Sequence, residues 1–142
     1  MRLISITAMK IFGYLDYYLD FNQDLNLLIG TNGSGKTTIL KMILAIFANN
    51  FVYLASLNFK EIELKYIDNN GKNVIVTLKG SEHTYKNKGK PILSSFEVFV
   101  SNPAVEIIVS IRDGEVFAIE DLLNNHGEYL LSDLGRPMFL GA

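Results

Sequence analysis

The residues with the clearest chemical signature lie in one glycine-rich stretch near the N-terminus. The stretch Gly30-Thr31-Asn32-Gly33-Ser34-Gly35-Lys36-Thr37 fits the phosphate-binding pattern G-x-x-x-x-G-K-[ST] at every specified position. In such a loop the glycines allow positive φ angles, so that backbone N–H groups can surround phosphate oxygens. The lysine adds a charged donor to the outer phosphates, and the threonine hydroxyl binds the bridging magnesium ion. The stretch, called the phosphate loop below, predicts a site for a nucleoside triphosphate.

The elements beside the phosphate loop fit this prediction. Residues 26–29 end an apolar run that is typical of a buried strand, and residues 38–48 carry apolar side chains at helical spacing, so we expect a core helix there. The first N–H groups of a helix have no partners within the helix, and its dipole places partial positive charge at that end. A phosphate is therefore favoured at the junction. We assign nucleotide contacts to Asn32, Gly33, Ser34, Gly35, Lys36, Thr37 and Thr38, a catalytic role to Lys36 and magnesium coordination to Thr37.

The rest of the chain is rich in alternating apolar and polar residues. Strands are predicted over residues 2–11 and 17–21 before the phosphate loop, and a hairpin over residues 59–67 and 73–79 after the helix. Further strands are predicted over residues 95–100, 105–111 and 116–119, whereas residues 51–58 fit either a helix or a loop. The pattern predicts one α/β domain, 1–142, with the phosphate loop and its helix in residues 1–50 and a mainly antiparallel β lobe in residues 51–142.

The order of these elements resembles the ABC-class, AAA-type P-loop ATPase heads of the SMC, RecF and OLD-like families. The resemblance rests on Met9-Lys10-Ile11-Phe12, on Leu19-Asp20-Phe21, and on the run from Leu25 to Thr38 that contains the Walker A phosphate loop. It implies the N-terminal lobe of such a head, followed by further chain in the intact protein. ATP and Mg²⁺ are the implied cofactors, and hydrolysis would be coupled to dimerisation through the nucleotide face, with a second copy or a partner subunit.

The same resemblance suggests an aromatic contact to the nucleotide. In these families the adenine base often rests against the strand–turn–strand that precedes the phosphate loop, where this chain has Phe12, Tyr14 and Tyr17. Tyr14 follows Gly13 and is expected to be the most exposed of the three, so we predict that Tyr14 contacts the base. Ordinary packing in the core is the alternative for each of them.

Two parts of a complete ATPase site are not evident. Such a site needs an Asp at the end of an apolar strand, a neighbouring Glu that orients the attacking water, and a Leu-Ser-Gly-Gly signature. The nearest carboxylates, Glu120-Asp121, have the reverse order and follow a predicted hairpin strand, so we expect a surface strand end there. The chain alone is therefore expected to lack the Walker B and signature motifs. A nucleotide-dependent interaction module without hydrolysis is the first alternative, and a small P-loop kinase is less favoured because the chain has only three arginines, Arg2, Arg112 and Arg136.

Composition limits the remaining classes. The formal net charge is −2, which does not indicate a nucleic-acid-binding domain, although Lys86, Lys88 and Lys90 could form a local basic patch within an expected solvated loop over residues 80–91. The chain contains no Cys, and its longest apolar run is far shorter than the roughly 20 residues that span a bilayer. A cytoplasmic location without a membrane segment is the resulting expectation.

Overall fold

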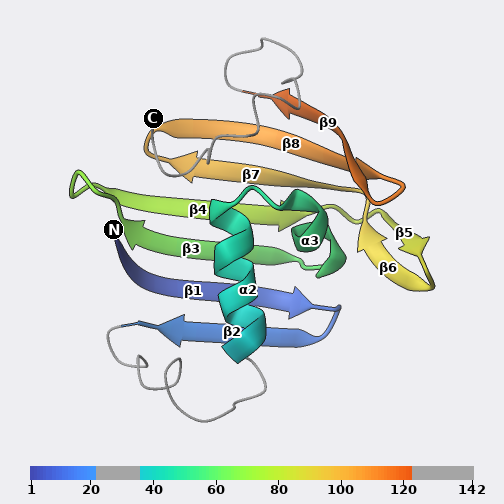
Figure 1. The fold of residues 1–142 in the computed structure, drawn as a ribbon, viewed down its shortest axis with the longest axis horizontal. Coiled ribbons are helices and arrows are strands. Elements are labelled where there is room, and N and C mark those ends of the chain that lie inside the picture. The colour runs from blue at the N-terminus through green and yellow to red at the C-terminus, as the bar shows by residue number, and fades with distance from the viewer. Residues whose placement is uncertain (22–35, 123–142) are drawn as a thin grey trace.

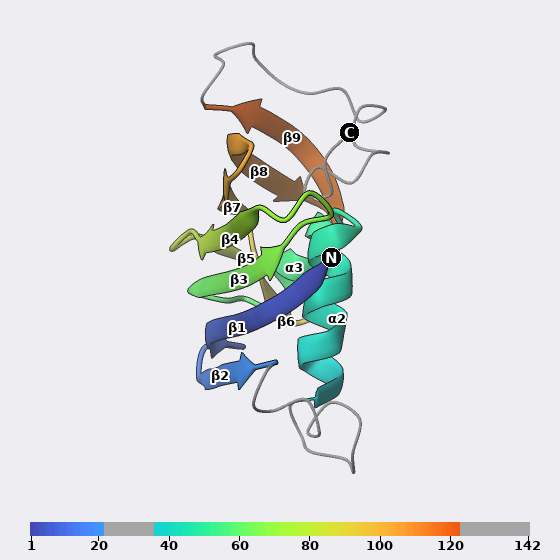
Figure 2. The ribbon, with the colours of Figure 1, turned by 90° about the vertical axis from the view of Figure 1, so that its left-hand side faces the viewer.

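The computed structural model describes residues 1–21 and 36–122. Its centre is a seven-stranded sheet in the order β2-β1-β3-β4-β7-β8-β9, in which every neighbouring pair is antiparallel. Two helices lie on one face of this sheet, as Figures 1 and 2 show. The elements are β1 (Arg2–Ile11), β2 (Leu15–Asp20), α2 (Lys36–Phe47), α3 (Phe51–Ser56), β3 (Glu61–Ile67), β4 (Asn73–Gly80), β5 (Thr84–Asn87), β6 (Lys90–Leu93), β7 (Ser95–Ser101), β8 (Ala104–Arg112) and β9 (Glu115–Asp121).

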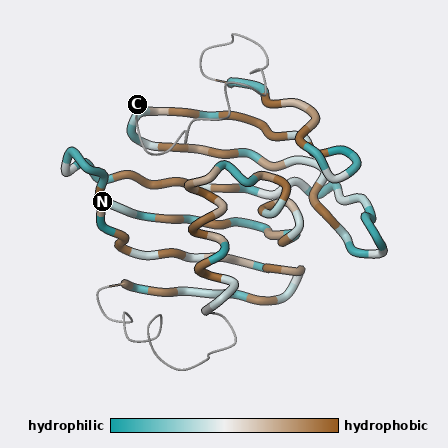
Figure 3. The backbone as a smooth tube through the Cα atoms, viewed as in Figure 1, coloured by the Kyte–Doolittle hydropathy of each residue, from teal (hydrophilic) through white to brown (hydrophobic). Residues whose placement is uncertain are grey.

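Alternation along the strands separates the two faces of the sheet. On the face that carries the helices, Ile6 lies opposite Leu64, Leu64 opposite Val76, and Val76 opposite Val100, and all four side chains are buried. The residues next to them in sequence point to the other face, where no helix of the described residues lies. Figure 3 shows this alternation as changes of colour along each strand. The predicted strands over residues 2–11, 59–67, 73–79, 95–100, 105–111 and 116–119 are confirmed with small shifts of their ends.

Helix α2 is anchored to the sheet by one side and exposed on the other. Its buried side chains are Ile39, Met42, Ile43, Ala45 and Ile46. Leu40 and Leu44 are 50% and 60% exposed, so the expectation of a helix buried among core residues is wrong for that side. They lie four residues apart and therefore share one outward face.

The end of α2 leads directly into a second helix. Asn49 adopts a left-handed conformation with φ 55°, and the Asn50 N–H donates to the Ala45 carbonyl oxygen at 2.8 Å, which is the Schellman pattern. The Asn50 side chain then accepts the Tyr53 N–H at 3.2 Å and caps α3. Residues 51–56, for which the sequence left helix and loop open, are therefore helical because the two asparagines end one helix and begin the next.

The segment predicted as a solvated loop, residues 80–91, is largely a small hairpin. Strands β5 and β6 pair as a separate two-stranded sheet, with Asn87 opposite Lys90. This hairpin leaves the large sheet at Gly80, where an added Cβ would lie 2.1 Å from the Phe59 carbonyl oxygen. The prediction failed because polar, lysine-rich strands lack the apolar alternation by which strands are recognised.

The core between the sheet and the helices contains a group of aromatic side chains. Phe96 is 1% exposed and meets Phe51 and Phe59 edge to face, with ring centroids 5.9 and 5.6 Å apart. Phe47 of α2 meets Tyr66 of β3 in the same way at 5.2 Å. In the described part of the chain, neither helix is long and apolar enough to cross a bilayer.

Candidate functional site

The first turn of α2 carries the described portion of the predicted nucleotide site. The helix begins at Lys36, Thr37 is exposed in its first turn, and Thr38 is half-buried. The other predicted loop contacts, Asn32, Gly33, Ser34 and Gly35, lie outside the described residues, as does the strand predicted over residues 26–29. The expected helix over residues 38–48 is confirmed with both bounds slightly earlier, so the motif lysine and threonine belong to the helix itself.

The electrostatics of this helix end suit an anion. The first turn of α2 contains no acidic residue, so no side chain of that turn offsets the positive end of the helix dipole. The helix is 12 residues long, and Ile39, Met42 and Ile43 hold its N-terminal half against the sheet. A phosphate bound at Lys36 and Thr37 would therefore meet N–H groups that the core already holds in position.

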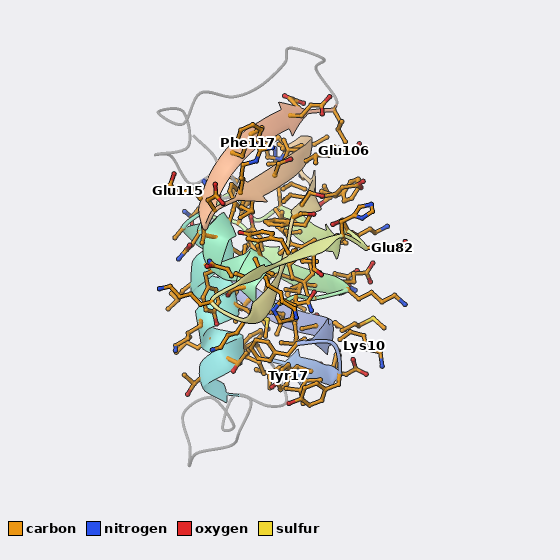
Figure 4. The ribbon with its side chains drawn as sticks, turned by 90° about the vertical axis from the view of Figure 1, so that its right-hand side faces the viewer. Lys10, Tyr17, Glu82, Glu106, Glu115 and Phe117 are labelled. Atoms are coloured by element: carbon orange, nitrogen blue, oxygen red, sulfur yellow. The ribbon has the colours of Figure 1, made fainter. Side chains whose placement is uncertain are left out.

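The aromatic residues ahead of the phosphate loop lie in different places. Tyr14 lies in the turn between β1 and β2 and is 71% exposed, as expected, and its N–H donates to the Ile11 carbonyl oxygen at 3.2 Å. Tyr17 lies opposite Ala8 and packs against the core on the helix-bearing face, at the sheet edge over which α2 begins (Figures 1 and 4). Tyr17 therefore shares a face with the start of α2, whereas contact between Tyr14 and a base stays a prediction.

The carboxylates Glu120 and Asp121 end β9, which is the edge strand farthest from β2 in the sheet order. They point to opposite faces: Glu120 is exposed opposite Ile108, and Asp121 is 6% exposed opposite Ile107 and already has an interaction partner. Among residues 1–21 and 36–122, no cluster of three or more acidic, histidine or cysteine side chains could hold a metal ion. The expectation of a surface strand end is confirmed for Glu120, whereas Asp121 ends the same strand with a buried side chain.

The lysines Lys86, Lys88 and Lys90 are exposed on the β5–β6 hairpin. Their sequence predicted a loop, whereas Lys86 and Lys90 lie in β5 and β6 and only Lys88 lies in the turn between these strands. The hairpin leans toward the turn between β8 and β9, where the Gly114 N–H donates to the Tyr85 hydroxyl oxygen at 3.3 Å. The lysines therefore belong to a defined structural unit at the end of the sheet opposite the β3–β4 turn (Figure 1).

Comparison with known proteins gives one informative result. A family model described as the AAA ATPase domain matches residues 5–104, which is more than half of the chain. The match runs from β1 through the phosphate loop and α2 to the first residue of β8. Neither the curated proteins nor the solved structures include a significant match to this sequence.

Proposed function

Because this chain belongs to the AAA ATPase domain family, a P-loop NTPase family, we propose that it binds ATP and Mg²⁺ through the phosphate loop at the start of α2. In this proposal the backbone of residues 32–35 surrounds the phosphates, Lys36 contacts the outer phosphates and Thr37 coordinates the magnesium ion. The observation that carries the proposal is the position of Lys36 and Thr37 in the first turn of a core-anchored helix that has no acidic residue there. Such a helix end is an anion site in its own right.

Hydrolysis is proposed for the intact protein, coupled to dimerisation through the nucleotide face. Its support is the family membership together with the resemblance to SMC, RecF and OLD-like heads. The described residues supply a helix end for phosphate, but Glu120 and Asp121 point away from each other at the far edge of the sheet. Electrostatic stabilisation of the transferring phosphoryl group is usually the largest catalytic term, so the 142-residue chain alone should hydrolyse ATP at no meaningful rate.

The decisive experiment compares ATP binding by the wild type, Lys36→Ala and Lys41→Ala, measured by calorimetry in the presence of Mg²⁺. Lys41 is exposed on the same helix, just over one turn beyond Lys36, and is the matched control for loss of one positive charge. A hydrogen bond to a charged group is worth about 1.5–3 kcal/mol, so Lys36→Ala should weaken binding roughly tenfold or more. Equal affinities of Lys36→Ala and Lys41→Ala, both folded by circular dichroism, would refute the assignment.

Phosphate release by the same proteins tests the second part of the proposal. The wild-type chain should bind ATP without measurable turnover. Turnover near about 1 per second that is absent from Lys36→Ala would show a complete active site within the chain, because the typical turnover rates of enzymes begin at about that level. A longer protein that contains this domain, and that binds ATP but never hydrolyses it, would favour the interaction-module alternative.

A further inference from the structure

A cavity of about 490 Å³ lies between the β5–β6 hairpin and the β8–β9 hairpin. Strands β8 and β9 are at the end of the sheet order opposite to β2. We call it the inter-hairpin pocket, and the side chains that matter in it are Tyr85, Ser94, Ser110, Arg112 and Phe117. Its volume falls within the range of about 300–1,000 Å³ that small-molecule sites occupy. Its lining residues come from the two hairpins and from Ser94, which lies between β6 and β7.

The walls of the pocket are held in place by two turns of the same kind. Each hairpin turns through two residues with positive φ, Lys88 (53°) and Gly89 (82°) in one and Asp113 (54°) and Gly114 (76°) in the other. These angles match the two-residue turns favoured in hairpins. The Tyr85 hydroxyl oxygen accepts the Gly114 N–H at 3.3 Å, so one turn is tied to the strand of the other hairpin.

A planar cation forms one side of the pocket. The Arg112 guanidinium carbon lies 4.2 Å from the centroid of the Phe117 ring, and Phe117 is 59% exposed; Figure 4 shows its position on β9. No ion pair or hydrogen bond engages the Arg112 side chain within residues 1–21 and 36–122. Because a guanidinium group can stack on a second planar group while its N–H donors remain free, this pair is a platform for a flat, anionic ligand.

The hydroxyl groups add donors. The Tyr85 oxygen accepts the Gly114 N–H, which leaves the phenol proton to donate, and the Ser110 hydroxyl has no hydrogen bond within the described part of the chain. The Ser94 hydroxyl donates to the His83 carbonyl oxygen at 2.9 Å, so its own oxygen is left to accept. Asp113, in the turn between β8 and β9, is the one carboxylate among the described residues of the lining. Donors outnumber acceptors, which favours a ligand that carries phosphate or other acceptor oxygens.

The β5–β6 hairpin supplies a further positive charge on the pocket side. Side chains alternate between the faces of a strand, so Asn87 shares a face with Tyr85, which lines the pocket. Lys90 lies directly opposite Asn87 and belongs to the same face. Lys86 lies opposite Pro91 and belongs to the other face. One exposed lysine therefore lies on the hairpin face that carries Tyr85, and another exposed lysine of the same hairpin lies on the opposite face.

We propose that the inter-hairpin pocket binds a nucleotide unit, with its base stacked on the Arg112–Phe117 pair and its phosphate held by Lys90 and the pocket hydroxyls. A stacked planar base and a phosphate are the two features that this set of side chains recognises together. Two sources carry that chemistry: a free mononucleotide, and one unit of a single-stranded nucleic acid. None of the described residues that line the pocket belongs to α2, and the proposal does not depend on the proposed function.

The test is carried out on the full chain with the Lys36→Ala change, which weakens nucleotide binding at the phosphate loop. One probe is AMP, whose binding is measured by calorimetry. The other is a fluorescein-labelled 15-nucleotide oligothymidylate, used as a single strand and as a duplex, whose binding is measured by fluorescence anisotropy. Arg112→Ala removes the group on which the base stacks and should weaken binding by roughly fivefold or more. Arg112→Lys keeps the charge but not the planar group and should recover only part of the loss.

The hairpin lysines give the matched pair. Lys90→Gln should weaken binding several-fold and reduce its dependence on salt, whereas Lys86→Gln should leave both unchanged. Binding of AMP assigns the pocket to free nucleotides, and binding of the single strand alone assigns it to a nucleic acid. The proposal would be overturned if neither probe bound at 1 mM. It would also be overturned if folded Arg112→Ala bound the probes as tightly as the protein with Arg112, or if the duplex bound as tightly as the single strand. With Lys36 intact, Arg112→Ala should keep its Mg²⁺-dependent ATP binding, so either proposal can fail while the other stands.

Discussion

The phosphate loop and the inter-hairpin pocket bring their side chains together in opposite ways. The loop places its whole predicted set within residues 30–38, and the start of α2 supplies the charge. The pocket collects Tyr85, Arg112 and Phe117 from three strands and Ser94 from the link between β6 and β7, and only the folded sheet brings them together. A site that is contiguous in the chain can be recognised as a motif, whereas one made from strand ends is recognised only after strand order and register are known.

The two regions also differ in what holds them. Helix α2 is fixed by its apolar side against the sheet, so the loop end of the domain depends on core packing. The pocket depends on two hairpin turns and on the hydrogen bond between Gly114 and Tyr85, which lie at the surface. Substitutions in the core should therefore disturb the structure of both regions, whereas substitutions in the hairpins should disturb the pocket alone. The predictions below test this difference, beginning with the largest effect.

Removal of the Phe96 side chain, which lies at the centre of the aromatic group in the core, should destabilise both regions together. Phe96→Ala leaves a cavity between Phe51 and Phe59 and should lower the free energy of unfolding by about 3–5 kcal/mol, as measured by urea denaturation. Phe99 lies on the opposite face of the same strand, where Lys79 is 5.5 Å from its ring, so Phe99→Ala should cost about 1 kcal/mol or less. Similar losses in the two variants would mean that the helix-bearing face is not the core.

A methyl group at the base of the β5–β6 hairpin should affect the pocket more than the loop. In Gly80→Ala the new Cβ would lie 2.1 Å from the Phe59 carbonyl oxygen, so the backbone must shift, at a cost of about 1–3 kcal/mol. The Gly80 N–H also donates to the Lys60 carbonyl oxygen at 3.0 Å, and this bond would be distorted. Calorimetry should show weaker AMP binding with ATP binding retained. Lys79→Ala, one residue earlier and exposed, is the control and should be stable.

The magnesium role of Thr37 can be separated from any structural role. Thr37→Val keeps the shape of the side chain and removes its oxygen, at a position that is exposed in the first turn of α2. ATP binding in Mg²⁺ should weaken several-fold, since one hydrogen bond or ligand is worth about 1 kcal/mol, and binding in EDTA should change little. The inter-hairpin pocket should not respond. If both ATP measurements fall alike, Thr37 supports the fold and not the metal.

The smallest effect concerns alkaline pH. Burial raises the pKa of Tyr66, and the negative charge of Asp68 raises it further. The phenol ionises near pH 10 in the unfolded chain and only at higher pH when folded, so its contribution to stability is complete below about pH 10 and is lost as the pH rises through the folded pKa. The urea midpoint should therefore fall between pH 9 and pH 11. Tyr66→Phe should show a shallower fall, and an identical fall would exclude Tyr66 as a cause.

Several features could be predicted from the amino-acid sequence alone because their signals are local. The alternation of apolar and polar residues predicted the positions of β1, β3, β4, β7, β8 and β9, because apolar residues at every second position indicate a strand with one buried face. The predicted helix ended at residue 48, one residue beyond the observed end of α2, and the next residue is an asparagine, which tolerates the left-handed conformation observed at Asn49. The phosphate loop was recognisable because its glycines, lysine and threonine act within one turn of backbone, and the family match covers that stretch.

Other features were decided only by tertiary structure. Leu40 and Leu44 have the spacing of core residues but lie on the outer side of α2, because the side that the sheet covers is set by the neighbouring strands and not by the helix itself. Tyr17 shares the face of α2 only because it pairs with Ala8. The contact between Arg112 and Phe117 arises from an irregularity in the pairing of β8 with β9, where Ser110 lies opposite Ala118 but Ile111 lies opposite Val116. Register and covered face are properties of several segments at once, so no pattern within one segment can determine them.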